Sequence, residues 1–319
     1  MAIDEIVRVL PQALRYLVKN LLVEYEKLQE IRLRVGRPFV IEYDNREYFL
    51  RMDGTLASER SDTYVVSAED IRESMEYISN YSMYAFEEEL RQGFITIQGG
   101  HRVGIAGKAV MQGCQVQNIR HVSFIHIRLS HQVKGCANSV ISYITHEDKV
   151  YHTLIISPPK CGKTTLLRDI IRQLSNGGNV RKGKNVGVVD ERSELGACYL
   201  GVPQNDLGIR TDVLDCCPKA EGMMMMIRSM APEVIAVDEI GSKEDMEAVD
   251  YAMNCGCVLI ATVHGETMED IRQKPILGEL VRARAFCRYI VLTNDGGVGT
   301  VKEIFDERGS LLYGGSRTC

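Results

Sequence analysis

The segment 155–167, which reads Ile-Ile-Ser-Pro-Pro-Lys-Cys-Gly-Lys-Thr-Thr-Leu-Leu, constrains the fold of this chain more than any other. A β-branched run leads into a tight turn, and Gly-Lys-Thr then opens a helix-forming stretch. This succession of strand, turn and helix is typical of the phosphate-binding loop G-x-x-x-x-G-K-[ST]. Ser157 stands at the position of the first glycine. A chance Gly-Lys-Thr turn is the alternative interpretation.

The residue types of this segment suit the triphosphate of ATP. Backbone N–H groups in such a loop, and at the start of the helix that follows, point at an anionic phosphate. Lys163 is expected to neutralise the β- and γ-phosphates, and the Thr164 hydroxyl to ligate Mg²⁺. The predicted ATP-binding segment consists of Ser157, Pro158, Pro159, Lys160, Cys161, Gly162, Lys163, Thr164 and Thr165.

A pair of carboxylates follows a second apolar run. Residues 234–237 predict a buried strand, and Asp238 and Glu239 come directly after it. Ligands of open α/β sheets bind at the carboxyl ends of the strands, so these carboxylates are expected beside the loop. We predict that Asp238 holds Mg²⁺ together with Thr164, and that Glu239 is the general base that activates water. An acidic strand end without a function is the alternative.

Two more predicted strands end in polar side chains. The run 185–189 leads to Asp190 and Glu191, which are expected to order water around Mg²⁺ or to help activate the attacking water. The run 257–263 leads to His264, where a sensor of the γ-phosphate would lie. The alternatives are an acidic loop for the first pair and a structural histidine for the second site.

Arginines that could act on the nucleotide occur in both halves of the chain. Arg282, Arg284 and Arg288 cluster near the C-terminus, and a cation near the phosphates of a neighbouring subunit would complete a site between subunits. The prediction names Arg284 for this role, with a solvated basic face as the alternative. Arg102 and Arg128 would touch the nucleotide only if they face a cleft between domains.

The length and composition of the chain predict two domains. A chain of 319 residues of which 45% are apolar can form two cores. The short polar segment 145–149 is the predicted boundary. We therefore expect a smaller α+β domain over residues 1–148, followed over 149–319 by an α/β domain with a central, mostly parallel sheet.

Several patterns in the first half support the α+β prediction. Apolar residues at helical spacing over 6–22 predict a helix that Pro11 breaks or kinks. Ser67 is a predicted N-cap of a second helix, which would bury Ile71, Met75 and Ile78. The other predicted elements are strands at 28–33, 39–41, 48–50 and 122–129, a helix at 84–91, and a glycine-rich hairpin at 93–107 that turns at Gly99 and Gly100.

Charge and cysteine content argue against several classes of protein. The chain has 43 acidic and 38 basic residues, a net charge of −5, so nucleic acid is not an expected partner. Its 10 cysteines lack the paired spacing of a zinc site and are expected to be reduced thiols of a cytosolic protein. We see no signal pattern and no apolar run of about 20 residues. We therefore expect a soluble protein that reaches membranes only through partners.

Together these motifs resemble a known group of proteins. Residues 238–248 and 256–264 are similar to the Walker B and histidine-box regions of the secretion ATPases, a branch of the RecA-like P-loop proteins. Residues 190–195 resemble the acidic box of this branch, and 284–292 its late arginine-containing segment. The resemblance implies a RecA-like ATPase domain and a homo-hexamer. The chain departs from the pattern of the branch at Ser157, Lys160, Asp238, Gly241, Ser242 and Cys257.

A closer resemblance covers nearly the whole chain. Residues 31–38, 99–107 and 157–169 are similar to segments of the sporulation stage III AA family. This resemblance implies a cytosolic ATPase of endospore formation in the mother cell. It also implies membrane proteins of the sporulation channel complex as partners, which would hold the chain peripherally at the inner face of the membrane.

Two other functions stay open on the sequence alone. A nucleotide-gated scaffold would bind ATP to hold a ring together, with negligible turnover. A RecA-like motor that acts on nucleic acid is the second, since one fold serves many functions. The acidic net charge and the absence of a long basic run count against the nucleic-acid motor.

Overall fold

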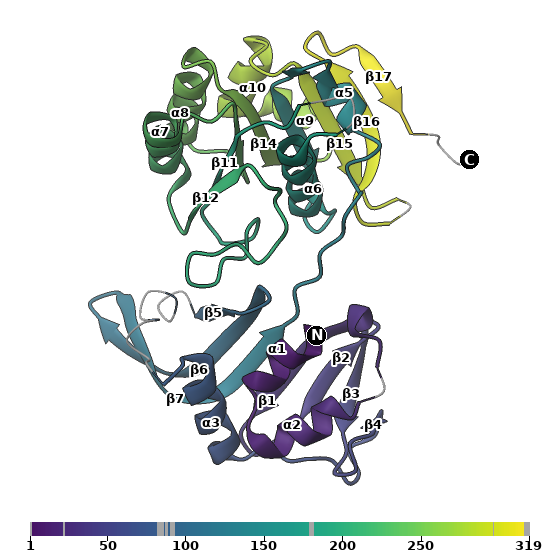
Figure 1. Cartoon of the computed structure of the whole chain (residues 1–319), viewed down its shortest axis with the longest axis vertical. Coiled ribbons are helices and arrows are strands. Elements are labelled where there is room, and N and C mark those ends of the chain that lie inside the picture. The colour runs from purple at the N-terminus through teal and green to yellow at the C-terminus, as the bar shows by residue number, and fades with distance from the viewer. Residues whose placement is uncertain are drawn as a thin grey trace. The chain divides into compact units, whose positions relative to one another are not determined.

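The chain forms two compact units, Met1–His131 and Gln132–Cys319. The predicted boundary at 148/149 lies inside the second unit, because Ala137, Val140 and Ile144 pack into the core of that unit. The computed structural model (Figure 1) describes residues 2–21, 23–81, 86, 89, 93–178, 182–295 and 297–315.

The first unit is a seven-stranded antiparallel sheet with helices. Among the described residues of this unit, the helices are α1 (Ala2–Arg8), α2 (Gln12–Lys19), the 3₁₀ turn η1 (Tyr25–Lys27) and α3 (Ala68–Ile78). Its strands, in their order across the sheet, are β4 (Leu56–Ala57), β3 (Arg46–Leu50), β2 (Val40–Tyr43), β1 (Leu28–Arg34), β7 (Gln115–Arg128), β6 (His101–Gln112) and β5 (Phe94–Ile97).

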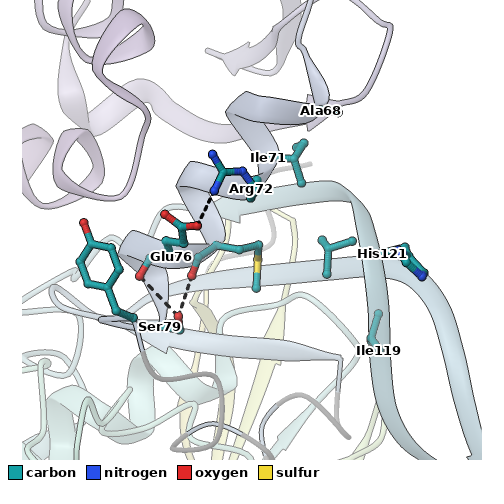
Figure 2. A pocket seen from close by; sticks show the side chains of 10 residues that line it. Ala68, Ile71, Arg72, Glu76, Ser79, Ile119 and His121 are labelled. Atoms are coloured by element: carbon teal, nitrogen blue, oxygen red, sulfur yellow. Dashed lines mark hydrogen bonds and ion pairs between the residues drawn. The ribbon is translucent and has the colours of Figure 1, made fainter.

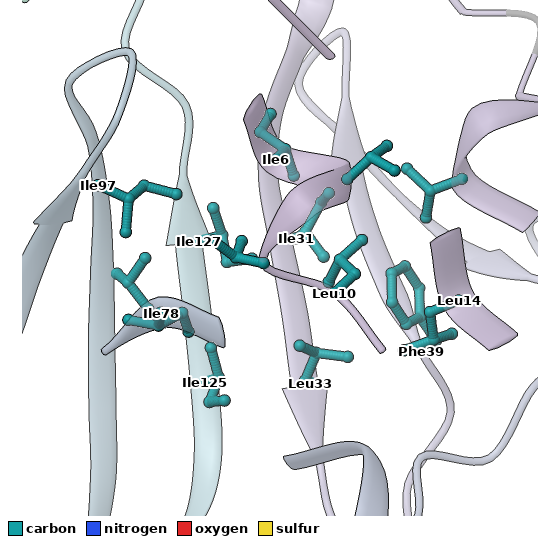
Figure 3. Close-up of a cluster of buried hydrophobic side chains, with 14 of the residues drawn as sticks. Ile6, Leu10, Leu14, Ile31, Leu33, Phe39, Ile78, Ile97, Ile125 and Ile127 are labelled. Atoms are coloured by element: carbon teal, nitrogen blue, oxygen red, sulfur yellow. The ribbon is translucent and has the colours of Figure 1, made fainter. Parts of the chain in front are cut away.

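One apolar core joins these helices to the sheet. Figure 3 shows Ile6 of α1 close to Ile31 and Ile127 of the sheet, and these side chains are fully buried. Burial of each such side chain stabilises the fold by roughly 1.5–3 kcal/mol. Pro11 separates α1 from α2, as predicted, because proline has no N–H for a continuous helix. The predicted N-cap is also confirmed, since the Ser67 hydroxyl accepts a backbone N–H in a capping box at the start of α3.

The predicted strands and hairpin of this unit are confirmed, with one difference in length. Gly99 and Gly100 both have positive φ angles, which glycine adopts without steric cost, and they turn β5 into β6. β6 and β7 continue to pair as far as Gln112 and Gln115, well beyond the predicted strands. The predicted helix at 84–91 lies outside the described residues except at positions 86 and 89.

The second unit is built on an eight-stranded sheet in which six neighbouring strands are parallel. These are, in spatial order, β12 (Thr211–Asp215), β11 (Val186–Asp190), β13 (Val234–Val237), β14 (Val258–His264), β10 (Thr153–Ser157) and β15 (Arg288–Thr293). Two antiparallel strands complete the edge, β16 (Thr300–Asp306) and β17 (Leu311–Gly314). A separate small pair is formed by β8 (Thr145–His146) and β9 (Lys149–Val150).

Helices cover both faces of this sheet. One core contains α5 (Ile141–Ile144) and α6 (Lys163–Asn176). The other contains α7 (Lys219–Met230), α8 (Lys243–Asn254), α9 (Met268–Gln273) and α10 (Pro275–Arg282). All residues of β10, β11 and β13 are buried, as expected for parallel strands between two helical layers. This arrangement confirms the predicted α/β class with a mostly parallel sheet.

Within the described part of the chain, every helix falls short of the length and apolar character needed to cross a bilayer.

Candidate functional site

The carboxyl ends of four parallel strands bring most of the predicted site residues to one edge of the second unit's sheet. β10 ends at Ser157, which lies beside His264 of β14 in the strand register. β11 ends at Asp190, and β13 is followed directly by Asp238 and Glu239. Parallel strands place their carboxyl ends at the same edge, so residues distant in sequence meet there.

The turn between β10 and α6 depends on two residues in the left-handed conformation. Gly162 is the N-cap of α6 and has a φ of 84°. A Cβ atom at this position would lie 3.0 Å from the backbone nitrogen of Gly299, a tight contact that favours glycine in addition to the positive φ. Gly299 also donates a hydrogen bond of 2.9 Å to the carbonyl of Cys161. Lys160, with a φ of 62°, adopts the left-handed conformation without being a glycine.

Ser157 occupies a place that does not require glycine. It is the last residue of β10 and is fully buried. Its hydroxyl donates a hydrogen bond of 2.8 Å to the carbonyl of Pro158. The extended backbone of a strand accepts serine, so the departure from the G-x-x-x-x-G-K-[ST] pattern has a local structural explanation.

The start of α6 contacts the acidic end of β13 directly. The Lys163 ammonium lies 2.5 Å from Oε1 of Glu239, and the Thr164 hydroxyl donates a hydrogen bond of 2.8 Å to Oδ2 of Asp238. Thr262, fully buried on β14, donates its hydroxyl proton to the other Asp238 oxygen and accepts the Glu239 backbone N–H at 2.9 Å. The two predicted motifs therefore meet at one site.

The Glu239 carboxylate is surrounded by cationic or proton-donating groups. His264 Nε2 lies 2.9 Å from the same oxygen that contacts Lys163, and Arg192 Nη1 lies 2.9 Å from the other oxygen. Burial raises the pKa of Glu239, but the Lys163 hydrogen bond and the nearby charges outweigh burial and hold this pKa below its usual value. The carboxylate is therefore ionised at neutral pH, as a general base must be.

Asp190 lies at the same edge but is enclosed by the protein. Its two carboxylate oxygens accept the backbone N–H groups of Glu194 and Gly196, each at 2.8 Å. Asp190 is 2% exposed, and burial raises its pKa to about 6 although these hydrogen bonds favour the charged form. These two hydrogen bonds anchor the segment 191–196 to Asp190, and the role of Asp190 in ordering or activating water stays a prediction.

Two further contacts fix the segment after β11. Glu191 pairs with Lys219 at the start of α7. Arg168 of α6 donates hydrogen bonds to the carbonyls of Glu194 and Leu195, at 2.7 and 3.1 Å. The helix that follows the turn and the acidic segment are therefore tied together through main-chain groups.

Arg284 is not brought to this edge. It is exposed, has a φ of 55°, and precedes β15, so it lies at the amino end of that strand. The predicted role concerns a neighbouring subunit and stays a prediction. Arg102 and Arg128 belong to the first unit, on β6 and β7.

Several residues of the site could not be predicted from the sequence. Arg192 was visible as the cation inside the acidic segment 190–195, but nothing local showed that it contacts Glu239. Thr262 lies within the predicted strand 257–263, and the sequence alone assigned it no role. Lys219 and Arg168 meet the acidic segment through tertiary contacts that carry no sequence signal.

The residues at this edge fit the chemistry of Mg²⁺ and a nucleotide. Within the described ranges, no group of three or more His, Cys, Asp or Glu side chains is suited to a metal. Mg²⁺ usually needs only one or two carboxylates, with phosphate and water oxygens as the other ligands. The adjacent Thr164 hydroxyl and Asp238 carboxylate provide that donor set. A pocket at the same edge is lined by Asp190, Glu191, Arg192, Glu194, Lys219, Asp238 and Glu239.

A different pocket, in the first unit, contains none of the predicted site residues. It has a volume of about 610 Å³ and lies between α3 and β7. Figure 2 shows Arg72 paired with Glu76 on α3, and Ile119 and His121 on the facing strand. The walls are mixed apolar and polar, without a cluster of catalytic groups. Pocket size alone therefore does not locate the candidate site.

Nearly the whole chain is similar to known proteins. A sequence model of the family "Sporulation stage III, protein AA" matches residues 2–312. The chain is 40% identical over 319 residues to "Stage III sporulation protein AA" of Bacillus subtilis (strain 168), a match that covers 99% of this chain and 100% of that protein.

Solved structures with a similar fold include an ATPase and a pilus retraction motor. The ATPase DotB of Legionella pneumophila has a TM-score of 0.54 and 16% identity, over 92% of this chain and 79% of that chain. The pilus retraction motor PilT, solved with bound ADP, has a TM-score of 0.53 and 15% identity, over 83% and 74% of the two chains. At these identities the likeness shows the fold, and it confirms the predicted RecA-like ATPase fold.

Proposed function

This chain belongs to the sporulation stage III AA family, and we propose that it is an ATP-hydrolysing motor of a secretion-like apparatus in endospore formation. One observation carries the proposal. Lys163 and Thr164, at the start of α6, lie within hydrogen-bond distance of Glu239 and Asp238, which follow β13. ATP hydrolysis uses a lysine and a hydroxyl for the phosphates and the metal, and carboxylates for the metal and water.

The turn at 157–162 and the first turn of α6 would hold the triphosphate. The free N–H groups at the N-terminus of α6 are donors for phosphate oxygens. Lys163 would move its ammonium group from Glu239 to the β- and γ-phosphates. Mg²⁺, held through Thr164 and Asp238, supplies the positive charge that neutralises the phosphates.

Glu239 would act on the attacking water. Its lowered pKa keeps it ionised and able to accept a proton. His264, within hydrogen-bond distance of Glu239, would sense the γ-phosphate at the end of β14. Glu191, in the segment that Asp190 anchors, would order water around the metal. In this proposal Asp190 does not act on water itself but positions the segment 191–196, by accepting hydrogen bonds from the N–H groups of Glu194 and Gly196.

We further propose that six copies form a ring, in which Arg284 of one subunit approaches the nucleotide of the next. The ring would act in the mother-cell cytoplasm, peripherally at the inner face of the membrane, with membrane proteins of the sporulation channel complex as partners. Particle mass in solution, measured with and without ATP and Mg²⁺, tests the ring. The mass of a single subunit in both conditions would contradict it.

The decisive experiment measures phosphate release and ATP binding by the wild type, Lys163→Ala and Glu239→Gln. We expect Lys163→Ala to lose ATP binding, because the phosphates lose their cation. Glu239→Gln should still bind ATP but release phosphate at least about 100-fold more slowly, because the general base is gone. The matched controls Lys302→Ala and Glu244→Gln change exposed residues of the same types. Equal rates of phosphate release in the wild type and all variants would rule out ATP hydrolysis by this protein.

A nucleotide-gated scaffold is the alternative that one observation favours. The Glu239 carboxylate is engaged by Lys163, His264 and Arg192, and such a network can hold a bound state as well as drive turnover. Under this alternative, Glu239→Gln would support sporulation as well as the wild type does, whereas Lys163→Ala would fail. Under the motor proposal both variants fail.

A further inference from the structure

The two carboxylate oxygens of Glu239 face different neighbours. Oε1 contacts Lys163 at 2.5 Å and His264 at 2.9 Å. Oε2 contacts Arg192 at 2.9 Å. Lys163 is the group that nucleotide binding would draw toward phosphate, so its contact with Oε1 is exchangeable. The Arg192 contact is on the opposite oxygen and does not compete with it.

The main chain of Glu239 is fixed, but its carboxylate is not fixed by the main chain. Its φ of 54° is in the left-handed region, which residues other than glycine rarely adopt. The N–H of Glu239 donates to the Thr262 hydroxyl at 2.9 Å, which fixes the main chain. The carboxylate is three rotatable bonds away from that anchor, so its direction depends on the side chains that contact it.

The segment that carries Arg192 is held on both sides. Asp190 accepts the N–H groups of Glu194 and Gly196. Glu191 pairs with Lys219. Arg168 from α6 adds its hydrogen bonds to the main chain of the same segment. The main-chain segment from which Arg192 reaches Glu239 is therefore tied to β11, α6 and α7.

We propose that Arg192 is a positioning residue for Glu239: it holds Oε2, so that Oε1 faces the side where Lys163 and the phosphates of ATP meet. This inference rests on the proposed ATPase function and adds to it a residue that acts through the general base. The Arg192 side chain is 66% exposed, and exposed ion pairs add little to the stability of a protein. We therefore assign the contact a role in orienting the partly buried Glu239 carboxylate rather than in stabilising the fold.

Steady-state hydrolysis of ATP by Arg192→Ala and Arg192→Lys tests the role. We expect KM to stay within about twofold and kcat to fall about 10- to 100-fold in Arg192→Ala, because a misdirected base affects the chemical step. Arg192→Lys should recover part of kcat, since it restores the charge without the planar fork of arginine. The control is Arg72→Ala, which removes an arginine of similar exposure, 61%, paired with two glutamates on α3.

A double-mutant cycle separates positioning from a general loss of structure. If Arg192 acts through Glu239, Glu239→Gln combined with Arg192→Ala should be no slower than Glu239→Gln alone, within about twofold. Losses that multiply would overturn the proposal. Unchanged kcat in Arg192→Ala, relative to Arg72→Ala, would overturn it as well.

A second readout does not depend on turnover. Crystal structures of the nucleotide-free variants show the direction of the Glu239 carboxylate. We expect this carboxylate to leave its wild-type rotamer in Arg192→Ala, because one of its contacts is lost, and to keep that rotamer in Arg72→Ala. An unchanged Glu239 rotamer in Arg192→Ala would overturn the proposal whether or not the protein hydrolyses ATP. A wild type without ATPase activity whose Arg192→Ala variant shows the change would instead reject the proposed function and keep the positioning role.

Discussion

The Thr164 hydroxyl donates a hydrogen bond of 2.8 Å to Oδ2 of Asp238, and so joins the start of α6 to the end of β13. Thr262 of the intervening strand β14 donates to the other oxygen of the same carboxylate. Three elements that are separate in sequence thus orient one acidic group. The donor pair that we propose for Mg²⁺ is preorganised, because these hydrogen bonds hold both of its members in place.

We expect Asp238→Asn to weaken the dependence of ATP binding on Mg²⁺. The amide keeps the shape of the side chain but removes the negative charge, so the apparent affinity for Mg²⁺ should fall about tenfold or more. Binding of a fluorescent ATP analogue across a Mg²⁺ titration measures this. Asp250→Asn, an exposed change on α8, is the control. Identical Mg²⁺ curves for the two variants would contradict a metal role for Asp238.

Gly162→Ala should disrupt the turn before α6. Alanine disfavours a φ of 84° by about 1–2 kcal/mol, and its Cβ would lie 3.0 Å from the Gly299 nitrogen. We expect the free energy of unfolding to fall by at least that amount and ATP binding to be lost. Urea denaturation and nucleotide titration measure the two effects. Gly178→Ala, where a Cβ meets nothing within 4 Å, should change neither.

Lys160→Gly should act in the opposite direction on stability. Lys160 has a φ of 62°, so glycine would remove steric strain worth about 1 kcal/mol. We expect a higher free energy of unfolding in urea denaturation. Lys160→Ala is the matched control, since it removes the charge but keeps the strained backbone. If both variants gain equally, charge rather than backbone strain is the cause.

The parts of the fold that short segments determine could be predicted from the sequence. The β-branched run before Gly162 and the apolar run before Asp238 are both strands of one sheet. They could be predicted because a buried parallel strand that ends in polar residues is recognisable from a few consecutive residues. The helix that starts after Ser67 was predictable for the same reason, since a capping box needs only four consecutive residues.

What the sequence did not show depends on long-range packing. Arg192 faces Glu239 only because β11 and β13 are adjacent and the segment after β11 folds back. The boundary between the units lies earlier than predicted, because the apolar residues before the polar segment 145–149 pack into the second core. Neither fact follows from composition or periodicity.

We expect Ser67→Ala to destabilise the first unit by about 1 kcal/mol. The Ser67 hydroxyl accepts the Asp70 N–H at 3.0 Å, and the Asp70 carboxylate accepts the Ser67 N–H at 2.8 Å. Alanine removes the first bond and leaves a free donor at the start of α3. Ser67→Asn should recover most of the loss, because asparagine is also a good N-cap. Urea denaturation measures both variants, and equal stability of wild type and Ser67→Ala would contradict the role of the cap.

The buried carboxyl group of Asp190 should make stability depend on pH. Burial raises its pKa to about 6 from an ordinary value of 3.8, so the folded state binds the proton more tightly than the unfolded state does. Between about pH 4 and 6 the folded state therefore holds more protons, and stability falls as pH rises, by at most about 1.4 kcal/mol per pH unit, and then levels off above pH 6.

Asp190→Asn should remove this slope. The amide does not titrate. It has one acceptor oxygen instead of two for the Glu194 and Gly196 N–H groups, which changes the free energy of unfolding by the same amount at every pH. The test is the free energy of unfolding of wild type minus that of Asp190→Asn, measured in urea from about pH 4 to 8. This difference should decrease between about pH 4 and 6 and stay constant above. A difference that increases with pH would mean that the hydrogen bonds outweigh burial and lower the pKa of Asp190.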